Sequence, residues 1–237
     1  MKNSERDAPE PLPPIPTNQI HPHRRRVMEQ AIRTFKRPIH ALEVGSWFGE
    51  GSTRVWLENL HPGSTLTLVD AWRPYASSAD RLEDREWDYA AMDGQASEAF
   101  LATFLTVRRF ETAYPGRVAV DIIRGDSERV LERLRTGIFD FIYIDGDHKY
   151  ASVVSNLREA KRLARNDLAM ICGDDLEKMP TPELLELARR HLDRDFLRPP
   201  HEFHPGVMLA VHEELGSVSM DHGFWWVIKG GGRYFTG

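Results

Sequence analysis

The sequence is poor in cysteine, in long apolar runs and in excess positive charge. Its single cysteine, Cys172, excludes an internal disulfide and fits a reducing compartment. No stretch reaches the roughly 18 consecutive apolar residues that a membrane helix needs, and no apolar signal region follows the charged N-terminus. The formal net charge of −5 does not favour nucleic-acid binding. These absences predict a cytoplasmic protein with a small-molecule partner, no membrane or nucleic-acid partner, and homo-oligomerisation left open.

The 237 residues suffice for one α/β domain with a substantial core. Residues 1–25 are polar, charged and rich in proline, a composition that disfavours packing, so we expect a flexible N-terminal arm there. Residues 26–237 should form the single domain. The basic run at 21–26 could contact an anionic group of a substrate, but the start of a solvated helix is the simpler interpretation.

Acidic residues follow two predicted strands. Residues 139–144 form a nearly continuous aromatic and β-branched run, which is typical of a parallel strand buried on both faces. Asp-Gly-Asp-His follows it at 145–148. A second apolar run, 168–172, ends in Gly-Asp-Asp, and the residues between the two runs have the apolar spacing of a crossover helix. Open α/β sheets bind ligands at the carboxyl ends of their strands, so we expect the active site here.

Three of these acids predict a metal site. If the two strands are neighbours, the carboxylates of Asp145, Asp174 and Asp175 should converge. They would repel one another and raise one another's pKa unless a cation lay among them. Oxygen ligands suit a hard divalent ion such as Mg²⁺, with water and substrate completing its shell.

A glycine-rich turn follows an earlier predicted strand, 40–44. Glycines at 45, 49 and 51 precede an amphipathic helix that runs through Leu60. This arrangement can cradle a ligand, because glycine lets the backbone approach closely and the helix start offers free N–H groups. The G-x-x-x-G-x-G spacing differs from the G-x-G-x-x-G that is usual for nicotinamide dinucleotides. Glu43, two residues before the first glycine, also argues against such a site.

Two further strand ends predict a nucleoside ligand. Asp70 follows the strand 65–69, where an acid can bind both hydroxyls of a ribose. Trp72 could stack on the ligand or belong to the core. A third strand, 118–123, leads into Asp126 and Ser127, which could bind a purine, cap the next helix, or do both.

Two connecting segments have two interpretations each. The polar insertion 75–95 could be a lid over the site or a surface excursion, and we favour the lid. The Pro- and His-rich loop 196–206 could line a substrate pocket or merely connect two elements. Residues 217–220 and 224–228 indicate a hairpin that closes the sheet.

These motifs resemble the class I S-adenosylmethionine-dependent methyltransferases between about residues 38 and 230. The most similar group is the metal-dependent one around macrocin O-methyltransferase, the rhamnosyl O-methyltransferases and the cephalosporin hydroxylase relatives. The resemblance implies an α/β, Rossmann-like fold with a seven-stranded, mostly parallel sheet in the order 3-2-1-4-5-7-6 and helices on both faces. The motifs are EVGSWFGEGST, VDAW, RGDS, FDFIYIDGDHKY, GDD and PGVMLAVHEEL.

The resemblance also implies roles for individual residues, with S-adenosylmethionine and a divalent metal as cofactors. Gly45 and Ser46 would lie beside the methionine part of the cofactor, Asp70 on its ribose, and Asp126 with Ser127 near its adenine. The predicted cofactor-binding residues are Glu43, Gly45, Ser46, Gly49, Ser52, Asp70, Trp72, Gly125, Asp126, Ser127 and Asp145; the predicted metal ligands are Asp145, Asp174 and Asp175; the predicted catalytic residues are Asp147 and His148.

The predicted activity is methyl transfer to a metal-chelated hydroxyl of a sugar or a polyhydroxylated natural product. A dehydrogenase is opposed by the glycine spacing, and a non-catalytic nucleoside-binding protein by the retained acids. Asp147 is favoured over His148 as the base, because side chains two apart on an extended strand point the same way. Asp147 would therefore lie beside Asp145, whereas His148 should point away unless Gly146 bends the chain.

Overall fold

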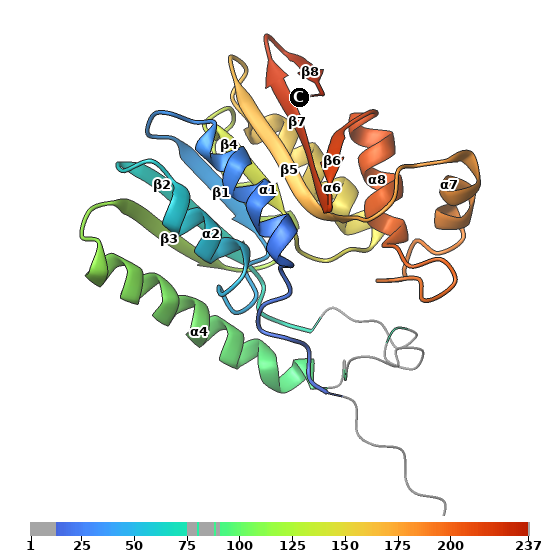
Figure 1. The fold of residues 1–237 in the computed structure, drawn as a ribbon, viewed down its shortest axis with the longest axis horizontal. Helices are drawn as coiled ribbons and strands as arrows, with labels where there is room; N and C mark the ends of the chain where they lie inside the picture. The colour runs from blue at the N-terminus through green and yellow to red at the C-terminus, as the bar shows by residue number, and fades with distance from the viewer. Residues whose placement is uncertain (1–12, 75–79, 81–87, 89–90, 237) are drawn as a thin grey trace, which may run out of the picture.

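A single mixed β-sheet forms the centre of the protein. The computed structural model describes residues 13–74, 80, 88 and 91–236. Among these residues the sheet order is β3-β2-β1-β4-β5-β7-β6, with β8 paired to β7 (Figure 1). The predicted order is therefore confirmed, and β8 is an additional strand. The strands are β1 (His40–Val44), β2 (Ser64–Asp70), β3 (Val118–Arg124), β4 (Phe141–Ile144), β5 (Ala169–Leu176), β6 (Ser219–Asp221), β7 (Gly223–Gly230) and β8 (Arg233–Phe235).

Strand direction also agrees with the expectation. Strands β1 to β5 pair in parallel, and β7 runs antiparallel to β5. The hairpin predicted to close the sheet is present as β6 and β7, and it turns at His222 and Gly223, both with positive φ. Because the first five strands are parallel, their carboxyl ends lie at one edge of the sheet. The predicted acids are at this edge, at the last residue of β2, directly after β4 and near the end of β5.

Helices cover both faces of the sheet, as expected. Helices α1, α2 and α4 pack on one face, and α5, α6 and α8 pack on the other, with α7 beside α8 (Figure 1). No helix in the described ranges combines the length and apolar character that a membrane span requires. The helices are α1 (Pro22–Arg33), α2 (Ser52–Asn59), α4 (Met92–Ala113), α5 (Ser127–Leu131), α6 (Tyr150–Leu163), α7 (Pro182–Arg189) and α8 (Pro205–Leu215).

The apolar runs in the sequence reflect burial between these two helical layers. In β4, Phe141 and Tyr143 pack in the core with α1 and α2, whereas Ile142 and Ile144 pack in the core with α6 and α8. All four side chains are buried, so the strand shows no polar alternation. The same two-sided burial explains the apolar start of β5.

Strand β5 continues further than its apolar run. It extends through Asp174 and Asp175 to Leu176, and its pairing with β7 is irregular between Gly173 and Leu176. Asp175 has a φ of 65°, in the left-handed region that few non-glycine residues adopt. The two aspartates therefore lie within a distorted strand end, and this distortion helps to send their side chains in different directions.

The N-terminal segment, residues 13–20, packs against the domain. The Trp47 indole N–H donates to the Pro16 carbonyl (3.1 Å), and Gln95 Nε2 donates to the Ile15 carbonyl (2.9 Å). Pro22 begins α1, where proline fits because no intrahelical N–H bond is lost. Residues 13–25 of the predicted flexible arm, 1–25, therefore either contact the domain or belong to α1. Residues 1–12, and almost all of the predicted lid at 75–95 before α4 begins, lie outside the described residues.

Candidate functional site

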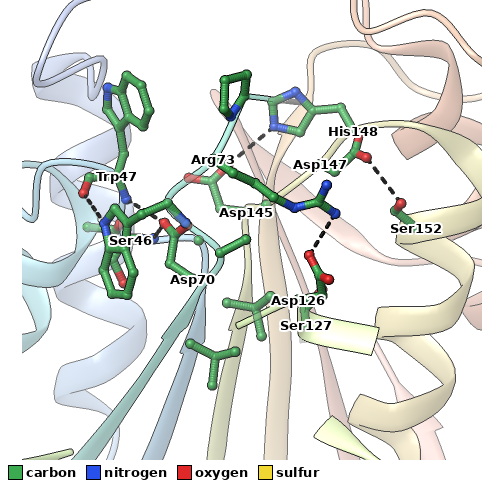
Figure 2. Close-up of a pocket in the computed structure, with 18 of the residues that line it drawn as sticks. Ser46, Trp47, Asp70, Arg73, Asp126, Ser127, Asp145, Asp147, His148 and Ser152 are labelled. Carbon is green, nitrogen blue, oxygen red and sulfur yellow. Dashed lines mark hydrogen bonds and ion pairs between the residues drawn. The ribbon is translucent and has the colours of Figure 1, made fainter. Parts of the chain in front are cut away.

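A cavity of about 510 Å³ opens at the carboxyl ends of β1, β2 and β4 (Figure 2). Its volume is typical of small-molecule sites. The N-terminal segment, the glycine-rich turn, the stretch after β2, the start of α5 and the stretch after β4 form its walls. The predicted cofactor-binding residues that line it are Gly45, Ser46, Ser52, Asp70, Trp72, Asp126, Ser127 and Asp145.

Gly45 brings two walls of the cavity into direct contact. Its φ is +89°, and a Cβ at this position would lie 1.8 Å from the carbonyl oxygen of Asp145. Its N–H donates to the Val69 carbonyl at 2.9 Å. Any side chain here would therefore push the glycine-rich turn away from the acidic end of β4. Gly49 and Gly125, also predicted to bind the cofactor, do not line the cavity.

Asp70 organises the backbone around the cavity. Its Oδ2 accepts the N–H groups of Ser46 (2.8 Å) and Trp47 (2.9 Å), and its Oδ1 accepts that of Trp72 (2.6 Å). Burial raises the pKa of the carboxyl, although these three N–H groups counteract the rise. Carboxylate oxygens accept more than one hydrogen bond. Asp70 therefore fixes two turns and still has acceptor capacity toward a ligand.

Trp72 belongs mainly to the core. It is 1% exposed, its indole N–H donates to the Trp47 carbonyl at 2.8 Å, and its ring meets Phe100 edge-on with centroids 5.0 Å apart. It still forms part of the cavity wall. Of the two predicted roles, packing is therefore the one supported by direct contacts.

Arg73 was missed by the sequence analysis. Figure 2 shows its side chain reaching toward Asp126, where its guanidinium lies 2.6 Å from Asp126 Oδ1. Asp126 is the N-cap residue of α5, yet its side chain makes no cap hydrogen bond. Asp126 therefore faces the cavity and Arg73 rather than capping the helix.

Glu43 lies beneath the cavity and does not line it. It is fully buried, its Oε2 accepts a hydrogen bond from Thr53 Oγ1 (2.7 Å), and its Oε1 has no partner among the described residues. Burial raises the pKa of this carboxyl to about 8. Any effect of Glu43 on the cofactor is thus indirect, through the start of α2.

The buried Glu43 should make stability depend on pH. Its pKa rises from 4.5 to about 8 on folding, so the native state holds the proton more tightly than the unfolded state. The contribution of Glu43 to the free energy of unfolding is complete below pH 4.5 and is lost as the pH rises to about 8. Across that pH range the free energy of unfolding of the wild type should therefore fall by on the order of 3 to 5 kcal/mol relative to that of Glu43→Gln. Urea unfolding of both proteins as a function of pH measures this, and parallel profiles would contradict it.

Six residues form an acid–histidine cluster beside the cavity: Asp145, His148, Asp175, Glu177, Asp195 and His204. They make three overlapping groups of three, and within each group the potential metal-binding atoms lie within 4.8 Å of one another. The first three were predicted from the sequence. Glu177 and Asp195 were not, and His204 was predicted only as part of the loop 196–206, because the connection that carries these residues has no recognisable motif.

His148 is at the centre of the cluster. Its Nδ1 lies 2.8 Å from Asp195 Oδ1, and its Nε2 lies 3.1 Å from Asp175 Oδ2 and 3.6 Å from Asp145 Oδ1. Burial alone would lower the pKa of the imidazole, but the carboxylates of Asp195 and Asp175 outweigh burial and raise it well above its ordinary value. His148 is thus a strongly proton-binding side chain at the edge of the cavity.

His204 makes a second carboxylate–imidazole pair. Its Nδ1 lies 2.6 Å from Glu177 Oε1, and its ring meets that of His148 edge-on with centroids 4.6 Å apart. Gly206 anchors this loop, because a Cβ there would lie 2.2 Å from the carbonyl oxygen of His148. These contacts agree with the interpretation that the loop 196–206 lies at the site, and not with a mere surface connection.

Asp174 lies beside the cluster, where the Tyr143 hydroxyl is 3.4 Å from its Oδ2 and 2.9 Å from Asp145 Oδ2. Asp174 Oδ2 accepts a hydrogen bond from Arg24 at 2.7 Å, and Asp174 belongs to none of the three groups that the described residues form. Burial and the neighbouring Asp175 raise its pKa, whereas Arg24 lowers it. The structure therefore brings Asp145 and Asp175 together with His148, and it pairs the third predicted ligand with an arginine from the basic run.

The chain does not stay extended after β4, which was the condition for His148 to point away from Asp145. Strand β4 ends at Ile144, so the alternation of an extended strand does not continue through 145–148. Asp147 lines the cavity, but its oxygens accept the Lys149 N–H (3.0 Å) and the Ser152 hydroxyl (3.2 Å) at the start of α6. His148, expected to point away, faces Asp145.

Comparisons with known proteins identify the class of this chain. Residues 42–176, more than half of the sequence, match the family described as a methyltransferase domain, and the chain belongs to that family. The prediction of a methyltransferase is thereby confirmed. No curated protein matches the sequence.

Solved structures agree with the fold. A putative caffeoyl-CoA O-methyltransferase from Staphylococcus aureus is 12% identical, with 89% of this chain and 85% of that chain covered and a TM-score of 0.53. The cofactor-bound protein Rv0187 from MTB is 16% identical, with 94% and 84% covered and a TM-score of 0.53. At these identities the similarity concerns the fold.

Proposed function

We propose that this protein is an S-adenosylmethionine-dependent, divalent-metal-assisted O-methyltransferase that acts on a hydroxyl of a sugar or a polyhydroxylated natural product. The main support is one cavity that has the Gly45 turn and Asp70 among its walls and also reaches Asp147 and His148. Donor and acceptor could therefore meet beside a titratable side chain. The similar structure from Staphylococcus aureus, described as a putative O-methyltransferase, is consistent with transfer to oxygen.

The cavity residues fit the proposed methyl donor. S-adenosylmethionine supplies the electrophilic methyl group when bound. The absence of a side chain at Gly45 lets the glycine-rich turn lie against Asp145, so that both line the cavity in which the donor's methionine part would bind. Asp70 has acceptor capacity for the ribose hydroxyls, and Asp126 with Ser127 would bind near the adenine.

The acid–histidine cluster fits a divalent metal through its donor atoms. Asp145 and Asp175 would hold the ion, which stabilises the acceptor alkoxide when bound. Two carboxylates with waters and substrate are a ligand set that Mg²⁺ accepts. The adjacent His148 and His204 bring nitrogen donors that Mn²⁺ or Zn²⁺ tolerates better. Asp174 would have to leave Arg24 before it could serve as the third ligand.

His148 is the side chain placed best to take the acceptor proton, which it can do only in its neutral form. Because the neighbouring carboxylates raise the pKa of His148, the neutral form becomes populated as the pH rises. Asp195 pairs with Nδ1, which fixes the ring and leaves Nε2 facing Asp145 and Asp175. A general base must reach the proton that it removes, and Nε2 is on the side where the acceptor hydroxyl would lie. Asp147 remains the alternative base, with both of its oxygens already accepting hydrogen bonds at the start of α6.

Two measurements test the proposed function. Calorimetry should show binding of S-adenosylmethionine and no binding of NAD, and the reverse result would indicate a dehydrogenase. A methyl-transfer assay with a panel of hydroxylated acceptors should give product that disappears with a chelator. Cofactor binding without product for any acceptor would favour a non-catalytic nucleoside-binding protein.

Removal of the Asp70 carboxylate should weaken cofactor binding. Asp70→Ala loses three charge-assisted hydrogen bonds to the turn backbone and the proposed contacts to ribose. Hydrogen bonds to charged groups contribute on the order of 1.5 to 3 kcal/mol each, so the affinity for S-adenosylmethionine should fall about tenfold or more. Calorimetry measures it, with Asp121→Ala, an exposed aspartate on β3, as the control. An unchanged Kd would exclude Asp70 from the cofactor site.

A further inference from the structure

Helix α4 presents an apolar stripe to solvent. Leu101, Phe104 and Leu105 are 56%, 45% and 39% exposed, respectively. The opposite side of the helix is buried, with Thr103 and Val107 facing the protein. In Figure 1 the helix lies along the outer margin of its layer, next to β3. Three large apolar side chains adjacent on an exposed helix are more than scattered surface residues, and they mark a contact surface.

The stripe has charged residues of opposite sign at its two ends. Glu98 and Arg108 are both exposed, and with Leu101 and Leu105 they recur at steps of three, four and three residues. This is the spacing of a two-helix seam, in which such positions face a partner helix. The four residues are called the α4 seam below.

The α4 seam is complementary to itself in the antiparallel sense. The pairs Glu98–Arg108 and Leu101–Leu105 share one midpoint, at residue 103, so a single two-fold axis satisfies both pairs. A two-fold contact requires such self-complementarity, because both copies use the same surface. If Glu98 of one copy meets Arg108 of the other, then Arg108 of the first copy meets Glu98 of the second. A parallel arrangement would instead place Glu98 against Glu98 and Arg108 against Arg108.

The existing partner of Arg108 does not prevent this pairing. Arg108 lies 2.8 Å from Glu111 on the same helix, with its side chain 62% exposed. Exposed ion pairs of this kind contribute little to stability, and a guanidinium has enough N–H donors to bind a second carboxylate. Glu98 has no ion pair among the described residues.

We infer that the α4 seam joins two copies of this chain in an antiparallel, two-fold dimer. The seam puts apolar side chains at the centre and opposite charges at both ends, so the charge pattern selects another copy of the same helix. The surface is small for a permanent dimer, so the association is weak and depends on concentration. This inference does not depend on the proposed activity.

Charge reversal in solution tests the dimer. Sedimentation velocity over a concentration series should show a monomer–dimer equilibrium for the wild type. Glu98→Arg and Arg108→Glu should each weaken it by at least about tenfold, because each places like charges opposite each other. The double variant Glu98→Arg/Arg108→Glu should restore dimerisation. Glu132→Arg, an exposed acid at the end of α5, is the control and should leave the equilibrium unchanged.

Other outcomes would overturn the inference. A wild type that stays monomeric at all concentrations excludes the dimer. A dimer that withstands both single reversals, or that the double variant fails to restore, forms through another surface or in another orientation. All substitutions are at exposed positions, and circular dichroism checks that each variant keeps its fold.

Discussion

Replacing His148 with alanine should lower turnover by about 10² to 10⁴, the usual contribution of a general base. The imidazole lies against Asp145 and Asp175, and Asp195 holds its Nδ1 at 2.8 Å. No other titratable nitrogen in the described part of the chain both lines the cavity and lies among the acids. Single-turnover methyl transfer at saturating cofactor measures the loss. Calorimetry should show that S-adenosylmethionine still binds.

Asp147→Asn is the matched comparison. An asparagine can still accept the Lys149 N–H through its Oδ1, and its amide nitrogen can donate to the Ser152 hydroxyl, so the start of α6 should keep its structure. Turnover should fall less than in His148→Ala. If Asp147→Asn lowers turnover more than His148→Ala does, Asp147 is the base, as the sequence predicted.

Asp175→Asn should remove most of the metal affinity. Changes to residues that only support a metal ligand typically cost about 10- to 100-fold in affinity, and the loss of a ligand should cost more. Asp175 is the one carboxylate of the acid–histidine cluster that takes part in two of its three overlapping groups, so its loss should affect the site most. Titration with Mg²⁺ and Mn²⁺, together with turnover in the presence and absence of EDTA, measures the effect. Full activity in EDTA would refute the metal site.

Asp174→Asn should behave differently, because Asp174 pairs with Arg24. Breaking a buried ion pair by neutralising one partner typically costs about 3 to 5 kcal/mol, and both side chains here are largely buried. The variant should therefore unfold more easily but retain most of its metal affinity. A metal affinity as low as that of Asp175→Asn would show that Asp174 leaves Arg24 when the ion binds.

The local sequence was sufficient to predict the sheet and the position of the cavity. Strand β1 has the predicted bounds, because its start and end are fixed by burial and by the Gly45 turn. Sheet order followed from the resemblance rather than from any property of a single strand. The carboxyl ends of parallel strands always share one edge of the sheet, so Asp70 and Asp145 could be placed at one site before any coordinates were known.

The orientation of individual side chains could not be predicted in this way. Asp174 and Asp175 are adjacent and chemically alike, but Arg24, 150 residues from Asp174 in the sequence, lies 2.7 Å from Asp174 and 3.7 Å from Asp175. Asp195 and His204 reach the site on a connection whose path depends on the packing of α7 and α8. Local patterns carry no signal for such long-range contacts. This is why the sequence predicted that acids gather at this edge of the sheet but not which of them come together.

The N-terminal segment has a consequence for kinetics. Ile15, Thr17 and Ile20 form part of the cavity wall, and contacts from Gln95 and Trp47 hold this wall in place. A ligand enclosed behind such a wall enters and leaves only as fast as the wall parts, as with the mobile loops that limit turnover in many enzymes. If the cavity holds the proposed cofactor, parting of this wall would limit both its association and its dissociation. Substitutions in the N-terminal segment should then change the residence time of the cofactor more than its equilibrium affinity, whereas Asp70→Ala should change the affinity.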